Sequence, residues 1–205
     1  PYSGLHSYVQ TGALTSRQYV EQELTRPGLL PDAVAPITLD WDFNGPLGWT
    51  MPANTYNYTG QSAMQVIQEI AQGAGGFVNS HPLNRELIIR PEYPLPYWEW
   101  AAATPDKVLP EHIIKSMSLD WEEKPTYNGV HVSGEETGVT AFVRRTGTDG
   151  AKQAPPEVSA MISHADAARS KGIAILSSGG IQALMGLDMP MFSSIGLLTP
   201  GMLLE

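Results

Sequence analysis

Two carboxylates in the first quarter of the chain have the spacing that a catalytic or metal site requires. Asp40 and Asp42 lie in the alternating stretch 37–43, which runs into Asn44, Gly45 and Pro46 and so predicts a strand followed by a turn. Alternate strand residues share a face, so the two carboxylates could hold one hard cation or divide acid and base roles. The favoured interpretation is simpler: both are solvated on the outer face, with Trp41 directed inward.

The other reactive residue types do not form a recognisable site in the sequence. The chain has no cysteine, which excludes disulfides, thiolate nucleophiles and cysteine-type zinc sites. The five histidines are scattered, the glycine run at 73–76 follows a predicted helix when a phosphate loop should precede one, and there is no Gly-x-Ser-x-Gly elbow. We therefore expect no catalytic residue, no metal, no cofactor and no enzymatic activity.

The aromatic segment 93–100 is the best candidate for recognition. Tyr97, Trp98 and Trp100 are candidate interface anchors, because buried aromatic side chains carry much of the binding energy at protein interfaces. Two alternatives stay open for this segment. It could pack between two subdomains of one chain, or Trp98 and Trp100 could stack on a sugar beside Glu99.

Composition excludes several classes of partner. A net charge of −9 and a pI of about 4.9 disfavour nucleic acid, and Arg144 and Arg145 suit ion pairs or an interface better than a phosphate patch. No apolar run is long enough to span a bilayer, so no membrane insertion is expected. Only 16% of residues are charged, while 20 glycines and 17 prolines predict a loop-rich, β-rich protein.

Helical and alternating patterns predict the elements of the N-terminal half. A short helix is expected at 16–24, capped by Thr15 or Ser16, and a second at 63–71, capped by Thr59 or Ser62. Gly73 is expected to supply the left-handed cap of the second helix. A β-hairpin with strands at 77–80 and 86–90 should follow.

The C-terminal half predicts further strands and one helix. Strands are expected at 113–121, 130–133, 139–143 and 181–189, the middle two as a hairpin, and the acidic residues 120, 122 and 123 suit exposed turns. Ser163 and Asp166 resemble a capping box for a helix ending at 177. Its buried stripe should be small enough to lie close to a sheet and comprises Ala165, Ala168, Gly172, Ile175 and Leu176.

These elements predict an α+β fold, mostly antiparallel, with small barrel-like subdomains and two or three packed helices. Residues 1–95 form the first subdomain, the proline- and aromatic-rich residues 96–110 a linker, and residues 111–205 a β-rich second subdomain with one helix. The chain begins without methionine and stops just after a Pro-Gly turn, so we interpret it as a fragment of a longer protein.

Several short motifs, taken in order, resemble bacteriophage tail proteins, in particular the hub-like proteins of Mu-like phages. The helix, glycine loop and hairpin of residues 63–91 come first. They are followed by YNGVHVSG at 127–134, VRRTGTDG at 143–150, HADAARSKGIAIL at 164–176, LDMP at 187–190 and LTPGML at 198–203.

The resemblance implies a virion structural protein of a phage or prophage tail, made in the bacterial cytoplasm and placed at the baseplate or tail-tip hub. Relatives of such hubs form the base of type VI secretion spikes. The implied partners are copies of the same chain, as a trimer in the full-length protein, and other tail or baseplate proteins. A carbohydrate-binding or cell-wall-degrading tail module, using either Trp98, Glu99 and Trp100 or the two aspartates, is the alternative.

Overall fold

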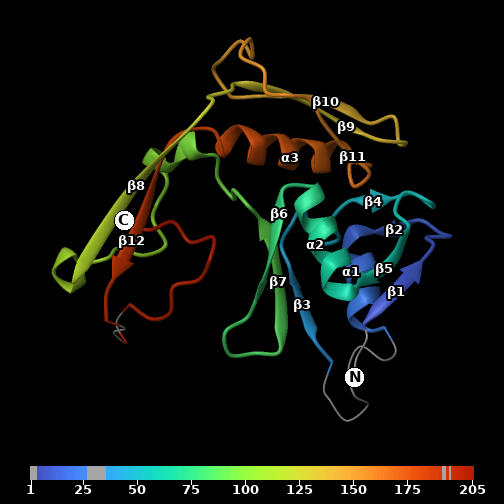
Figure 1. The fold of residues 1–205 in the computed structure, drawn as a ribbon, viewed down its shortest axis with the longest axis horizontal. Coiled ribbons are helices and arrows are strands. Elements are labelled where there is room, and N and C mark those ends of the chain that lie inside the picture. Colours follow the sequence, from blue (N-terminus) through green and yellow to red (C-terminus); the bar gives the residue numbers. More distant parts are fainter. Residues whose placement is uncertain (1–3, 27–35, 191–192, 194) are drawn as a thin grey trace.

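A computed structural model describes residues 4–26, 36–190, 193 and 195–205 of the chain (Figure 1). Within these residues the α-helices are α1 (Ser16–Leu24), α2 (Ala63–Gly73) and α3 (Ala165–Ser177), and two short 3₁₀ helices are η1 (Tyr97–Ala102) and η2 (Glu111–Ile113).

Three small sheets surround α1 and α2. Two of them are antiparallel pairs, β1 (Leu5–Tyr8) with β5 (Tyr58–Ser62) and β2 (Leu14–Thr15) with β4 (Thr50–Met51). In the third, β7 (Glu86–Pro91) is central, antiparallel to β6 (Gly76–Ser80) and parallel to β3 (Thr38–Trp41). The expected hairpin at 77–90 is therefore present and gains a parallel neighbour from an earlier segment.

The C-terminal half contributes a covered sheet and a projecting pair of strands. The sheet has β9 (Gly129–Gly134) at its centre, antiparallel to β10 (Thr140–Arg144) and parallel to β11 (Glu157–Ser159). α3 lies directly against β9 and β10 (Figure 1). The two long strands β8 (Ser116–Lys124) and β12 (Gly180–Asp188) pair antiparallel and extend to one side of the molecule. We call this pair the ribbon.

The α+β class with mostly antiparallel pairing is confirmed. The sheets of the described residues have two or three strands each, and none of them closes into a barrel, so the barrel-like form expected of the subdomains is not seen. Residues on both sides of the segment 96–110 contribute to a shared buried cluster. The division into two subdomains at that segment stays a prediction.

The pattern of α2 is confirmed except at its C-terminal end. Ser62 is the N-cap: its hydroxyl accepts from Gln65 N at 3.3 Å, and the Gln65 side chain accepts from Ser62 N at 2.8 Å. The left-handed residue that follows the helix is Gly75, with φ +81°, whereas Gly73 is still helical. A Cβ on Gly75 would lie 2.9 Å from Lys171 Cα, so the close approach of α3 requires glycine there.

α3 begins one residue later than its expected capping box. Ser163 donates its hydroxyl to Thr50 O at 2.8 Å, and His164 is the N-cap, accepting from Asp166 N at 3.3 Å. Ala165 is the first helical residue and is exposed, contrary to the expected stripe. The close packing is present at Gly172, where a Cβ would lie 2.5 Å from a Val143 methyl carbon.

The first ribbon strand differs from the sequence prediction in its bounds and in the position of its acidic residues. The strand expected at 113–121 is β8, shifted three residues later because Ile113 is buried in η2. The acidic residues Asp120, Glu122 and Glu123 consequently lie within β8 and not in turns, on a strand exposed enough to solvate them. The strand expected at 181–189 is present as β12.

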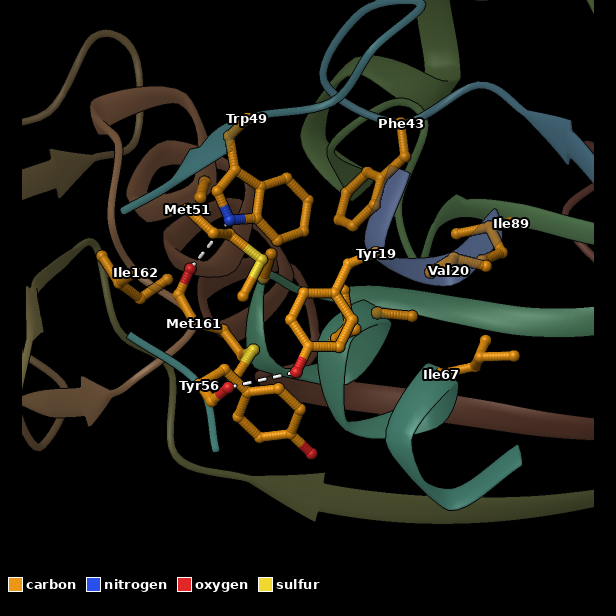
Figure 2. Packing of buried hydrophobic residues seen from close by; sticks show 14 of the residues in the cluster. Tyr19, Val20, Phe43, Trp49, Met51, Tyr56, Ile67, Ile89, Met161 and Ile162 are labelled. Carbon is orange, nitrogen blue, oxygen red and sulfur yellow. Dashed lines mark hydrogen bonds between the residues drawn. The ribbon is translucent and has the colours of Figure 1, made fainter. Parts of the chain in front are cut away.

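The buried core is rich in aromatic residues, as Figure 2 shows. Tyr19 from α1 and Ile67 from α2 are fully buried, and the Tyr19 hydroxyl donates to Tyr56 O at 3.1 Å. Trp49 Nε1 donates to Met161 O at 2.9 Å and so joins segments more than a hundred residues apart. This hydrogen bond connects the N-terminal half of the chain to the C-terminal half within the core.

Candidate assembly surface

The ribbon exposes an apolar face. Its register places Ala183 opposite Trp121 and Met185 opposite Leu119, and directly opposed residues share one face of a sheet. Trp121 is 67% exposed and Ile181 is 70% exposed. Together the face comprises Met117, Leu119, Trp121, Ile181, Ala183, Met185 and Leu187.

A contiguous exposed apolar face on a small protein is a characteristic of an interaction surface. Two antiparallel strands are also marginally stable in water until further strands or a helix join them. Eight of the nine residues of β8 are exposed, so in the described chain little packs on this strand beyond β12. The ribbon is therefore the first candidate for a surface that is buried on assembly.

The first half of β12 borders the aromatic segment. A groove of about 600 Å³ lies between Gln182 and Leu184 of β12 and the rings of Tyr93, Tyr97 and Trp100. Gln182 donates from Nε2 to Ser178 O at 2.9 Å, which ties the start of β12 to the end of α3. Burial raises the pKa of Tyr93 above its ordinary value.

Tyr97 and Trp98, two of the three candidate anchors, are engaged within the chain. The Arg145 guanidinium lies over both rings, 5.4 Å from the Tyr97 centroid and 5.3 Å from the Trp98 centroid. Arg145 Nη1 also donates to the Tyr97 hydroxyl at 3.0 Å. Both rings are partly buried, and Trp98 packs against the core cluster. These contacts fit the alternative in which the segment packs internally.

Trp100, the third candidate, is 46% exposed. It stacks on Tyr93 with 6.3 Å between ring centroids and 18° between planes, and its Nε1 donates to Leu95 O at 2.9 Å. A second groove of about 660 Å³, lined in part by Asp106 and Leu203, lies beside this stacked pair. The anchor role of the three residues stays a prediction, and Trp100 has the ring most accessible to a partner.

The two aspartates singled out in the sequence lie in different environments. Asp40 Oδ2 accepts from Arg90 Nη2 at 2.6 Å, and Arg90 belongs to the neighbouring strand β7. Asp42 lies just beyond β3 and is exposed, while Trp41 is buried. The arrangement agrees with the interpretation of two outer-face carboxylates around an inward tryptophan.

A buried carboxyl group lies near the end of α1. Glu23 is fully buried and accepts from the Tyr58 hydroxyl at 2.7 Å, and Arg26 pairs with the same carboxylate. Arg26 Nη2 also lies 2.6 Å from the Tyr58 hydroxyl. Burial, and then the hydrogen bond to Glu23, raises the pKa of Tyr58. Arg26 and Tyr58 both contact Glu23 Oε1, whereas Glu23 Oε2 and Arg26 Nε are buried without a hydrogen-bond partner among the described residues.

Among the residues with described positions, no group of three or more histidine, aspartate or glutamate side chains is placed to hold a metal ion. In the same part of the chain, no helix combines the length and apolar character needed to cross a bilayer.

Sequence reasoning identified both ribbon strands but not their pairing. The alternation at 181–189 was visible, and so was an apolar strand containing Leu119 and Trp121. The signal for pairing was that most residues of both strands alternate between apolar and polar, which gives each strand one mainly apolar face. Two such strands without another partner are suited to each other, although they lie far apart in sequence.

The comparisons with known proteins concern the fold. No protein-family model matches the chain, and no curated protein matches it by sequence. Its structure is similar to that of the tail protein from Neisseria meningitidis MC58, with a TM-score of 0.53 and 11% sequence identity over 98% of this chain. A second similar structure is the 43 kDa tail protein of prophage MuSo2 from Shewanella oneidensis, with a TM-score of 0.41 and 14% identity.

The chain is shorter than both of these proteins. It covers 59% of the Neisseria protein, and its match with the Shewanella protein covers 85% of this chain and 47% of that one. At 11% identity the first similarity shows a shared fold, so this chain has the fold of a tail protein.

Proposed function

We propose that this chain is a structural component of a bacteriophage or prophage tail, placed at the baseplate or tail-tip hub and acting through protein–protein assembly. The observation that carries the proposal is the similarity to the Neisseria tail protein, because it extends over 98% of this chain. The ordered motifs between residues 63 and 203 that resemble hub-like tail proteins support the finer placement.

The surface of the chain is suited to such a role. The apolar face of the ribbon is available for burial between subunits, and Trp100 offers a second apolar contact. A net charge of −9 suits a wall past which DNA moves without binding. The proposal includes assembly with copies of itself, as a trimer in the longer protein, and with other tail proteins, without an enzymatic step.

Localisation in intact particles tests the proposal. Virions of the phage or prophage that encodes the chain would be labelled with gold-conjugated antibody raised against residues 1–205, after partial disassembly to expose inner tail parts. We expect label at the end of the tail distant from the head. Label on the head, or tails assembled normally after deletion of the gene, would contradict a structural tail role.

A degradation assay tests the proposed absence of catalysis. Purified protein incubated with peptidoglycan should release no soluble fragments, because Asp40 is paired with Arg90 and Asp42 lies exposed just beyond β3. Release that disappears in an Asp40→Asn or Glu99→Gln variant would instead support the cell-wall-degrading alternative.

A further inference from the structure

β8 presents an unpaired edge. It is hydrogen-bonded to β12 on one side, and within the residues that the structure describes no strand pairs with its other side. In an antiparallel pair every second residue directs its N–H and C=O away from the partner, so this edge offers a row of free donors and acceptors. Eight of the nine residues of the strand that carries this edge are exposed.

The charges on that face follow a self-complementary order. At alternate positions β8 and the residue before it read Lys115, Met117, Leu119, Trp121 and Glu123. Lys115 N donates to Asp188 O at 2.8 Å, so pairing with β12 extends to this residue. Both charged ends are exposed, and neither forms a salt bridge with any other described residue.

We propose that this edge pairs with β8 of a second copy of the chain, antiparallel and across a two-fold axis at Leu119. In this register Lys115 lies opposite Glu123 of the second copy at both ends, Met117 lies opposite Trp121, and Leu119 lies opposite itself. A four-stranded sheet results, with β12 outermost on each side. Its apolar face is continuous across the axis.

The other face of the ribbon accepts the same register. There Ser116 faces Glu122 and Ser118 faces Asp120 of the second copy, so like charges are never directly opposed. A parallel, in-register pairing would instead place Glu122 and Glu123 beside their own copies, which repel. The antiparallel arrangement is therefore the one that the charges of β8 select.

Two competing partners fit this edge less well. The outer edge of β12 has Ile181, Ala183, Met185 and Leu187 on the apolar face, with no charge to match Lys115 or Glu123. A nucleic-acid strand would be repelled by Asp120, Glu122 and Glu123. A second β8 is matched in edge, apolar face and charge together.

The pairing gives the proposed assembly role a defined surface, and it rests on that role for its biological meaning. A two-fold contact is isologous, whereas a ring of three requires a heterologous one. The trimer proposed for the longer protein would thus use a different surface. The pairing through β8 is expected of residues 1–205 on their own.

Charge exchange tests the register. Sedimentation equilibrium of residues 1–205 should give a dimer whose dissociation constant rises roughly tenfold with Lys115→Glu or Glu123→Lys, because each single change opposes like charges at both ends. The variant carrying both changes restores the pairs and should dimerise like the parent. Lys152→Glu, an exposed loop change with the same charge difference as Lys115→Glu, is the control and should leave the dissociation constant unchanged.

The Glu123→Lys variant distinguishes the proposed strand register from a general effect of net charge on association. It lowers the net negative charge of the chain, so general repulsion between copies would decrease and association would strengthen. The proposed register predicts the opposite, weaker association. Stronger association of this variant, or failure of the double exchange to restore the dimer, would overturn the proposal.

Engineered thiols test the axis. The chain has no cysteine, so Leu119→Cys introduces one thiol, which should oxidise to a cross-linked dimer because it meets its own copy at the axis. Met117→Cys faces Trp121 of the second copy and should not cross-link. A protein that stays monomeric, forms only trimers, or cross-links equally at both positions contradicts β8 pairing. None of these results bears on gold labelling of the tail, which tests the tail role separately.

Discussion

The core around α1 and α2 and the ribbon place the same residue types in opposite environments. Trp49 is 2% exposed, donates its indole N–H to Met161 O and packs against two other aromatic rings. Trp121 is 67% exposed and lies on a strand with one neighbouring strand. Hydrophobic side chains in the core stabilise the fold of one chain, whereas those in the ribbon are available to another molecule.

The difference between these regions is a difference in what their residues contribute to stability. A buried apolar side chain gains free energy from its removal from water, and an exposed one gains almost none until a partner arrives. Substitutions in the core should therefore unfold the chain, while substitutions in the ribbon should alter only its association.

The largest effect is expected in the core. Ile67→Ala removes a fully buried side chain from α2 and leaves a cavity, which should lower the free energy of unfolding by about 2–5 kcal/mol. Urea denaturation followed by circular dichroism measures this loss. Leu83→Ala is the control, because Leu83 is 89% exposed, and it should change stability by less than about 0.5 kcal/mol. Equal losses in both variants would show that α2 does not organise the core.

A second comparison uses one glycine from each region. Gly172→Ala places a methyl group against Val143 and must separate α3 from β10, so about 1–3 kcal/mol of stability should be lost. Gly186→Ala on β12 meets only the Ser118 hydroxyl, the end of a side chain that can rotate away. Thermal unfolding should therefore distinguish them, and a Gly172→Ala protein as stable as the parent would contradict the close helix packing.

The tyrosine network of the core should make stability depend on alkaline pH. The pKa of Tyr58 is raised in the folded chain, so above pH 10 the unfolded chain loses this proton first. The contribution of the protonated Tyr58 to the free energy of unfolding is present in full at pH values below the pKa of Tyr58 in the unfolded chain. This contribution is lost as the pH rises through the higher pKa of Tyr58 in the folded chain. Between pH 10 and 11, Tyr58→Phe should lose up to about 1.4 kcal/mol less stability than the parent. The measurement is the free energy of unfolding of both proteins by urea denaturation at a series of pH values. If it falls with pH equally in the parent and in Tyr58→Phe, Tyr58 is not buried against Glu23.

The sequence predicted the elements whose determinants are local. The helix at 63–73 was visible because Val66, Ile67 and Ile70 lie on one face and Ser62 could cap it, and the hairpins of residues 76–91 and 129–144 have their turns within a few residues. Pairings between distant segments were not predictable. The parallel pairs β3–β7 and β9–β11 depend on contacts that no local pattern encodes.

The errors at helix ends have a similar physical origin. The run Gly73, Ala74, Gly75 and Gly76 contains three candidates for the left-handed cap, and only the approach of α3 selects Gly75. By sequence Ser163 could be the N-cap of α3, but in the fold its hydroxyl donates to Thr50 O. For the candidate anchors, the sequence grouped Trp98 with Trp100, and tertiary contact with Arg145 separates their environments.

The smallest expected effect on folding is in the ribbon. Trp121→Ser removes a large apolar side chain, yet the free energy of unfolding of the isolated chain should change by less than about 0.5 kcal/mol, because the ring is mostly in water already. Denaturation at protein concentrations below those that allow association measures this value. A loss of more than about 2 kcal/mol would show that Trp121 packs within its own chain. The ribbon would then be part of the core, and the contrast between the two regions would disappear.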